Sequence, residues 1–313
     1  MNTFLSALPI LLVIGVIFVN GWTDAPSAIT SCVCAKVLSM KKAVTLAAVC
    51  NFFGVFITSK LSSAVAENIF KATDSSTAAL CASMLSVITL AVCAWIFGIP
   101  TSESHAIIAA LTGATLASGS KVNTNVLIFT VVGLILSVAV GFILGYAIYA
   151  YIRSKSFTSK IMARFQVIGA AFMAFMHGAQ DGQKFISIYI AAAGGGFIMS
   201  NKIVLICSAV MALGTAFGGG RIIKTIGQKM VALDIEQGTA SDIAGSISLF
   251  LSTVLGMPVS TTHAKTAAVM GCGFVTGGIN KKTASEMLAA WVITFPACFI
   301  MGYLFTKLFK VLI

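Results

Sequence analysis

Long apolar runs, interrupted at a few places by polar residues, make up most of the chain. The runs near Ala78–Phe97, Leu127–Tyr149 and Leu288–Leu308 have the roughly 20 residues that a helix needs to cross a bilayer. We predict helical spans there and ten to twelve membrane segments in all. The first run, Phe4–Val19, has no basic segment before it and no small-residue cleavage site after it. It is therefore expected to stay as a helix and not to be a signal peptide.

Two polar stretches interrupt the apolar pattern, and each carries an aspartate. They read Asn20-Gly21-Trp22-Thr23-Asp24-Ala25-Pro26-Ser27 and His177-Gly178-Ala179-Gln180-Asp181-Gly182-Gln183-Lys184. Ionisable groups at membrane depth are costly and usually functional. Glycine and proline within these stretches predict that both helices are broken there. Non-helical backbone at that depth must be buried in protein or line a wet cavity.

A second pair of motifs places proline before a Ser/Thr-rich segment that ends in histidine. The two copies read Pro100-Thr101-Ser102-Glu103-Ser104-His105 and Pro258-Val259-Ser260-Thr261-Thr262-His263. Each is predicted to begin a new short helix, because Ser and Thr are favoured at helix N-caps. Together with the two aspartate stretches, these motifs predict a single midplane site built from four broken elements.

The two halves of the chain repeat at a constant spacing. Asp24 and Asp181 are 157 residues apart, and His105 and His263 are 158 apart. We divide the chain into a first repeat at 1–152, a basic cytoplasmic linker at 153–164 and a second repeat at 165–313. An odd number of crossings per repeat would invert the second copy relative to the first. The predicted fold class is therefore an all-α integral membrane protein of two inverted-topology repeats with broken or re-entrant helices.

Composition and charge agree with a multi-pass membrane protein. The chain is 58% apolar and 9% charged, with a formal net charge of +11 and a mean hydropathy of +1.01. Excess basic residues in such a protein collect in cytoplasmic loops, so they do not indicate a nucleic-acid partner. An extracytoplasmic amino terminus puts twelve of the 20 basic side chains in the cytoplasm. We predict a plasma-membrane protein within the lipid bilayer, with both termini outside. A homo-oligomer is compatible with the sequence.

The aspartate stretches and the Pro-x-Ser/Thr-rich-His elements resemble those of the inorganic phosphate transporter (PiT) family, whose members carry a Gly-x-Asn-Asp signature in each of two inverted repeats. The resemblance includes the segments Gly219-Gly220-Arg221-Ile222-Ile223-Lys224-Thr225 and Trp291-Val292-Ile293-Thr294-Phe295-Pro296. It implies uptake of inorganic phosphate by alternating access, coupled to sodium or protons with sodium favoured. No catalytic residue and no cofactor beyond the co-transported cation are implied.

The resemblance also implies which side chains bind each solute. Asp24 and Asp181 would be the sodium ligands, with further cation contacts from Asn20, Thr23 and Gln180. Thr23 and Gln180 stand in place of the signature asparagines. The side chains expected to contact phosphate are Thr101, Ser102, Ser104, Ser260, Thr261, Thr262, Gln183 and Lys184. Lys184 could instead neutralise Asp181 as an (i, i+3) pair.

Two charged residues depart from the family pattern. Glu103 replaces the usual serine, and Lys265 replaces a residue that is usually neutral. Each lies within three residues of a repeat-related histidine. Because inverted repeats bring the two hairpin tips together, we predict that Glu103 and Lys265 pair at the midplane as a gating or proton-linked couple.

Two alternative functions are compatible with the same residues. A sulfate permease of the same superfamily is one, because sulfate and phosphate share shape and charge. An intramembrane hydrolase is the other, since Ser104, His105 and the aspartates are the residue types of a hydrolytic triad. The duplication argues against the hydrolase, because a triad needs each role only once.

Overall fold

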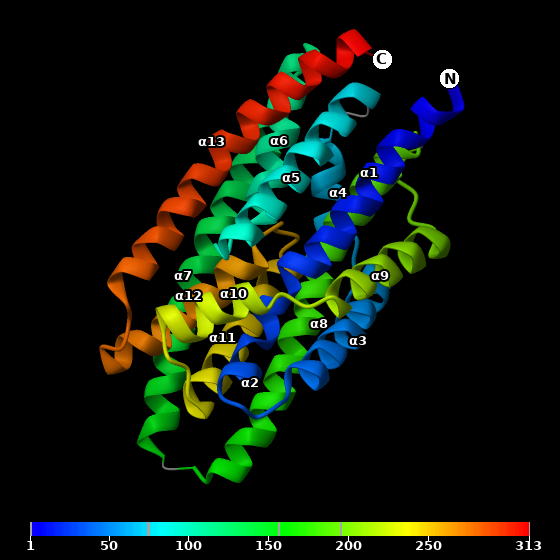
Figure 1. Cartoon of the computed structure of the whole chain (residues 1–313). Helices are drawn as coiled ribbons and strands as arrows, with labels where there is room; N and C mark the ends of the chain where they lie inside the picture. Colours follow the sequence, from blue (N-terminus) through cyan, green and yellow to red (C-terminus); the bar gives the residue numbers. More distant parts are fainter. Residues whose placement is uncertain (1, 74–75, 156, 195, 313) are drawn as a thin grey trace.

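The computed structural model describes residues 2–73, 76–155, 157–194 and 196–312, and within them every regular element is helical (Figure 1). The elements in chain order are α1 (Asn2–Thr23), the 3-10 helix η1 (Ala25–Ile29), α2 (Thr30–Cys34), α3 (Met40–Leu61), α4 (Ala64–Ala72), α5 (Thr77–Phe97), α6 (Glu103–Ser118), α7 (Thr124–Ser154), α8 (Ser159–Ala192), α9 (Asn201–Ala216), α10 (Gly220–Lys224), the π-helix η2 (Thr225–Met230), α11 (Ile235–Val254), α12 (Thr261–Thr276) and α13 (Lys281–Leu312).

Six segments of the described chain are long and apolar enough to cross a membrane, and they include the three predicted spans. They are Ala7–Cys34, Met40–Leu61, Thr77–Phe97, Thr124–Ser154, Ser159–Ala192 and Lys281–Leu312. A bent pair, α9 with the helices at Gly220–Met230, makes a possible seventh. Helices α6, α11 and α12 do not qualify. Helices α6 and α12 have only 16 residues each, and the many Ser, Thr and charged side chains of all three helices are buried inside the protein.

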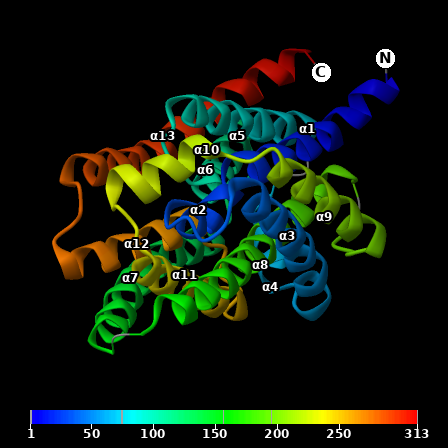
Figure 2. The ribbon, with the colours of Figure 1, turned by 60° about the horizontal axis from the view of Figure 1, so that its bottom comes forward.

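Equivalent helices of the two repeats start from opposite ends of the molecule. The amino terminus of α1 and the carboxyl terminus of α13 lie at one end, and the connection from α7 to α8 lies at the other (Figure 1). Helix α1 therefore runs away from the end with the termini, and α8 runs towards it. The second view shows α13 of the second half running beside α5 of the first half (Figure 2). This antiparallel relation of α1 and α8 is the inverted repeat that the sequence predicts.

Close helix packing follows the same symmetry. A Cβ atom at Gly21 of α1 would lie 2.3 Å from the Met211 carbonyl oxygen of α9, and one at Gly178 of α8 would lie 2.4 Å from the Asn51 carbonyl oxygen of α3. Gly21 and Gly178 are 157 residues apart. Small residues allow membrane helices to approach this closely. The two repeats therefore share the way in which their helices pack.

The predicted break at Asp24 is confirmed, but the break at Asp181 is not. Helix α1 ends at Thr23 and a 3-10 helix containing Pro26 follows, whereas α8 is continuous from Ser159 to Ala192. Proline lacks a backbone N–H and disrupts a helix. The second stretch contains no proline, and a helix tolerates the two glycines that it has. Gly178 and Gly182 pack against α3, so they serve close approach and do not break α8.

Both Pro-x-Ser/Thr-rich-His motifs begin helices, as predicted. Ser102 caps α6 by accepting from the His105 backbone N–H at 3.0 Å, and Ser260 caps α12 by accepting from the His263 N–H at 3.2 Å. The predicted basic linker at 153–164 includes the end of α7, at Ser154, and the start of α8, at Ser159. The repeat boundaries themselves stay a prediction.

Candidate functional site

The two signature aspartates contact one threonine at the centre of the molecule. Thr261 Oγ1, at the start of α12, lies 3.3 Å from Asp181 Oδ2 and 3.5 Å from Asp24 Oδ2. Asn20 Nδ2 donates to Asp181 Oδ2 at 3.1 Å. Asp24 is 6% exposed and Asp181 1%. The end of α1, the start of α12 and the middle of α8 therefore meet at one buried cluster of oxygen atoms.

The Lys184 ammonium joins this cluster to both hairpin tips. Its Nζ lies 2.6 Å from Asp181 Oδ1, 2.5 Å from Ser104 Oγ and 2.5 Å from the Val259 carbonyl oxygen. A lysine ammonium has three donors, and these three contacts use them all. Lys184 therefore neutralises Asp181 as the (i, i+3) partner in this conformation.

The contact between Lys184 and Ser104 has a counterpart in the other half of the repeat. Thr262 Oγ1 donates to Ser27 Oγ at 3.3 Å. Ser27 is 157 residues before Lys184, and Thr262 is 158 residues after Ser104. Each aspartate stretch thus contacts the hairpin tip of the opposite repeat. Only one of the two copies carries a positive charge at this contact.

His177 lies on the same face of α8 as Asp181, one turn earlier, and it was not among the predicted ligands. Its Nδ1 lies 3.0 Å from Asn51 Oδ1, and Asn51 Nδ2 donates to Thr215 Oγ1 at 3.1 Å. Because Asn51 donates through its nitrogen, its oxygen accepts from His177 Nδ1–H. His177 Nε2 faces Asp181 Oδ2 at 3.5 Å. An (i, i+4) spacing from the aspartate was the sequence signal that could have identified this histidine.

Asp24, His177 and Asp181 can together hold a metal ion. One ligand atom from each lies within 4.8 Å of the others, and all three residues are buried. Carboxylate oxygens suit a hard cation. Of the predicted cation ligands, Asn20, Asp24 and Asp181 are brought together here, and Thr261 joins them although it was predicted to bind phosphate.

The predicted pairing of Glu103 with Lys265 is wrong. Glu103 Oε1 accepts from Thr23 Oγ1 at 2.7 Å. Lys265 Nζ donates to Ser241 Oγ at 2.8 Å and makes a shorter contact with Asp242 Oδ1. Lys265 lies four residues beyond Thr261, about 6 Å further along α12. That depth places its ammonium beside α11 and away from the tip of α6, where Glu103 lies.

Asp242 and Ser31 complete this separate buried ion pair, and the sequence analysis missed both. Ser31 Oγ donates to Asp242 Oδ2 at 2.5 Å, which links α2 to α11. Lys265, Asp242 and Ser31 have no measurable exposure. Asp242 was a detectable signal, since it is an acidic residue within a helix otherwise rich in small and apolar side chains.

Two predicted glutamine ligands donate their hydrogen bonds to groups other than the aspartates. Gln180 Nε2 donates to Thr253 Oγ1 at 3.2 Å and to the Met257 carbonyl at 3.1 Å. Gln183 Nε2 donates to the Ala179 carbonyl one turn earlier, at 3.2 Å. The larger side chain of Gln180, in place of the signature asparagine, reaches the end of α11 and not the cation cluster.

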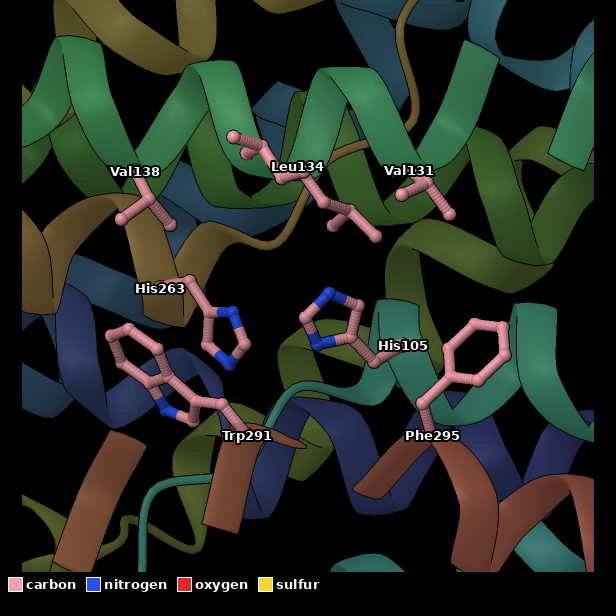
Figure 3. A pocket seen from close by; sticks show the side chains of 8 residues that line it. His105, Val131, Leu134, Val138, His263, Trp291 and Phe295 are labelled. Atoms are coloured by element: carbon pink, nitrogen blue, oxygen red, sulfur yellow. The ribbon is translucent and has the colours of Figure 1, made fainter. Parts of the chain in front are cut away.

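The two motif histidines line a different cavity. His105 and His263 lie with ring centroids 4.6 Å apart, and His263 stacks on Trp291 at 3.8 Å. Figure 3 shows these rings below Val131 and Leu134 of α7. The cavity is apolar and has a volume of about 470 Å³.

The residues of the hydrolytic alternative do not form a triad. His105 Nδ1 has no hydrogen-bond partner among the described residues. The Ser104 hydroxyl instead donates to the Val259 carbonyl oxygen at 2.9 Å. A triad needs the histidine to accept the serine proton and an aspartate to orient the histidine, and neither contact is made by these side chains.

Comparison with known proteins gives one consistent result. The model of the phosphate transporter family matches residues 20–161 and again residues 153–302. Probable low-affinity inorganic phosphate transporters of Bacillus subtilis and Rhizobium meliloti are each 32% identical to the chain. The alignments cover 91% and 92% of the chain and 91% of each relative. A solved structure described as the sodium-dependent phosphate transporter matches with a TM-score of 0.87 at 17% identity, over 99% of this chain and 100% of that one.

Proposed function

The chain belongs to the phosphate transporter family, and from that premise we propose that it imports inorganic phosphate together with sodium by alternating access. It is a membrane transporter and not an enzyme. Sodium coupling, the binding residues and the direction of transport are parts of the proposal. They are argued below from the contacts at the centre of the molecule.

The observation that carries the cation site is the position of His177 Nε2. With its proton on Nδ1, a neutral His177 turns the Nε2 lone pair towards Asp181 Oδ2 at 3.5 Å. Two acceptors that face each other in a buried site repel unless a cation lies between them. The Asp24 carboxylate is close enough to complete the same ligand set. A sodium ion bound by Asp24, Asp181 and His177, with the Thr261 hydroxyl beside it, would remove this repulsion.

The phosphate position that we propose lies at the adjacent starts of α6 and α12. Helix N-termini present free backbone N–H groups and the positive end of the helix dipole, both of which favour an anion. The oxygens of Ser102 and Ser260 accept capping hydrogen bonds, so their hydroxyl hydrogens stay available to an anion. Thr101 would be a further donor. The hydroxyls of Ser104, Thr261 and Thr262 donate within the protein in this conformation and would turn to the anion when it binds.

Charge explains why the two solutes would move together. Phosphate would approach the buried carboxylates Asp24 and Asp181, and only Lys184 among the described residues contacts either of them with a positive charge. Desolvating an anion there is unfavourable unless cations are bound as well. Sodium would therefore tighten phosphate binding, and phosphate would tighten sodium binding by the same factor.

Orientation in the plasma membrane also belongs to the proposal. The termini lie at one end of the molecule, and the connection between α7 and α8 lies at the other (Figure 1). That connection is flanked by Arg153, Lys155, Lys160 and Arg164. By the positive-inside rule the basic end would face the cytoplasm, which puts both termini outside.

Labelled-phosphate uptake into proteoliposomes, under separately imposed sodium and proton gradients, tests the proposed function. We expect an inward sodium gradient to drive phosphate accumulation, and excess sulfate to compete weakly. The exposed Glu286→Gln variant is the matched control and should transport normally. Accumulation driven by the proton gradient alone would contradict sodium coupling. Uptake of labelled sulfate at the rate of phosphate would favour the sulfate permease.

A further inference from the structure

The apolar cavity between the helices that carry the two hairpin tips has no role in transport as proposed above. Its volume is about 470 Å³, and His105, His263, Trp291 and Phe295 contribute to its lining. Four side chains of α7 form the remaining wall. We propose that this cavity binds an acyl chain of a bilayer lipid. The inference is independent of which ions are transported, because it concerns a separate site.

The helices around the cavity form two pairs. Helix α6 packs along α13, and α12 packs along α7. A Cβ atom at Gly302 of α13 would collide with the Ala110 carbonyl oxygen of α6. In the same way, a Cβ atom at Gly145 of α7 would collide with the Ala268 carbonyl oxygen of α12. Because Gly145 and Gly302 are 157 residues apart, the two pairs are related by the repeat. The cavity lies between them, with α7 and α13 on opposite sides (Figure 3).

Each hairpin tip reaches the cavity through one histidine. His105 lies in the first turn of α6, and His263 lies in the first turn of α12. Their ring centroids are 4.6 Å apart, and His263 stacks on Trp291 at 3.8 Å. The Trp291 indole N–H is already donated to the Pro100 carbonyl oxygen, at 3.3 Å. The stacked rings therefore form a largely apolar wall, and an occupant would contact both tips at once.

The cavity lies at the depth of the hydrocarbon core. Helix α7 spans residues 124–154 and α13 spans residues 281–312, so their midpoints lie at residue 139 and between residues 296 and 297. Val138 and Phe295 are within two residues of these midpoints. Val131 lies eight residues before residue 139, or about 12 Å along the helix axis. The hydrocarbon core extends about 15 Å to each side of the midplane, so the lining positions of both helices lie within it.

The cavity is open to the membrane beside α7. Val131 and Ile135 line it and are 37% and 65% exposed. Ile128 of α7 and Val292 of α13 are exposed as well. All four side chains are apolar, so the mouth meets the hydrocarbon of the bilayer.

An acyl chain is the occupant that suits this place. An apolar cavity offers too few polar partners to hold ordered water. Left empty, it would deprive its lining of packing contacts. At this depth the bilayer supplies hydrocarbon chains, whereas its head groups lie at the surface. A lipid chain that enters beside α7 would fill the space and act as an exchangeable packing element between the two hairpin tips.

Quenching of Trp291 fluorescence by brominated phosphatidylcholine tests the inference in proteoliposomes. Trp22→Phe with Trp95→Phe removes the other two tryptophans, neither of which lines the cavity, and gives a reporter chain. Trp291 is 7% exposed, so a bromine on lipid around the protein contacts it poorly. We expect bromines near the ends of the acyl chains to remove most of its emission. Bromines near the head group should remove little.

A larger side chain at the mouth should exclude the lipid. Val131→Phe in the reporter chain should abolish most of the quenching by chain-end bromines. Val132→Phe is the matched control, because Val132 is 42% exposed on the same helix and does not line the cavity. It should be quenched as strongly as the reporter chain. Equal quenching in both variants would overturn the inference, because the bromines would then act from lipid around the protein.

Thermal unfolding in detergent gives a second measurement, in chains that keep all three tryptophans. A ligand that binds only the folded state stabilises it. Phosphatidylcholine added to delipidated protein should therefore raise the unfolding temperature of the wild type and of Val132→Phe more than that of Val131→Phe. An equal rise in all three would contradict a specific site. Weak quenching of the reporter chain by every brominated lipid, together with elution as a dimer, would mean that a second copy covers the mouth and no lipid is bound.

Discussion

Thr261 connects the two aspartates of the site, and its contact with Asp24 ties together residues 237 positions apart in the chain. Its hydroxyl lies within 3.5 Å of both carboxylates, so a single hydrogen is shared between two acceptors. Shared donation of this kind satisfies neither carboxylate fully. The one ammonium at this site among the described residues, that of Lys184, cannot balance two carboxylates, so Asp24 and Asp181 together are the strongest candidates for cation ligands.

Replacing either aspartate by its amide should abolish sodium-driven uptake. Asp24→Asn and Asp181→Asn keep the side-chain shape but remove a charge that holds the cation. Both variants should still elute as folded protein in detergent, and phosphate uptake in proteoliposomes should fall to the level of empty vesicles. Near-normal sodium-driven transport by either variant would show that the two aspartates do not act together. Glu286→Gln is the control for expression and reconstitution.

Ser102→Ala and Thr261→Ala should separate the anion and cation contributions. Each removes a neutral hydrogen bond, whose loss typically costs about 0.5–1.5 kcal/mol, so several-fold effects are expected. Ser102→Ala should weaken phosphate binding with little change in the sodium dissociation constant. Thr261→Ala should weaken both, because its hydroxyl contacts the carboxylates. Titration of the purified variants with each solute measures this. An unchanged phosphate dissociation constant in both would move the anion site away from the hairpin tips.

Sequence spacing located the aspartates correctly but could not locate every partner. A repeat of 157 residues places Asp24 and Asp181 at equivalent points, and the structure brings both to Thr261. The partner of Lys265 could not be found in the same way. Asp242 has no acidic equivalent in the first repeat, because a spacing of 157 or 158 residues leads back to Leu85 or Met84. Pairing between helices also depends on depth along α12, which spacing in the sequence does not give.

At the scale of helices, the Lys265–Asp242 pair fastens α12 to α11 and, through Ser31, to α2. Removing one partner of a buried ion pair typically costs about 3–5 kcal/mol, because the other charge stays buried. Lys265→Met and Asp242→Asn should therefore each lower the thermal unfolding temperature strongly. The double variant Lys265→Met with Asp242→Leu should recover much of the loss.

Thermal unfolding in detergent, followed by tryptophan fluorescence, measures this effect. Lys202→Met is a matched control, because Lys202 is an exposed residue in the first turn of α9. It should leave the unfolding temperature unchanged. If the double variant is no more stable than the weaker single variant, the two side chains do not act as a pair.

Helix positions followed well from the sequence, while helix continuity did not. Apolar run length located α5, α7 and α13, and the Ser-capped starts of α6 and α12 followed from their motifs. The continuity of α8 through Asp181 was missed, because the Gly178 and Gly182 pair was interpreted as a break. Glycine in a membrane helix can either mark a break or allow a neighbouring helix to pack closely. The contacts of Gly178 and Gly182 with α3 show that they serve close packing.

At the scale of the whole molecule, the inverted repeat fixes which ends share a side of the membrane. Cysteine introduced at Lys310, near the end of α13, should react with a membrane-impermeant maleimide added to intact cells. Cysteine at Lys282, at the start of the same helix, should react only after the cells are opened. Both lysines are exposed. The unmodified chain, with its eight native cysteines, is the background control. The reverse labelling pattern would place the termini in the cytoplasm.

The central claim is that sodium and phosphate share one buried site and bind cooperatively. Phosphate dissociation constants of the purified protein, measured with sodium and with choline at equal ionic strength, test it most directly. Sodium dissociation constants are measured with and without phosphate. We expect each solute to tighten the other by the same factor, in the range of about 5- to 150-fold that is typical of such coupling. Phosphate binding that is equally tight in choline would contradict the claim.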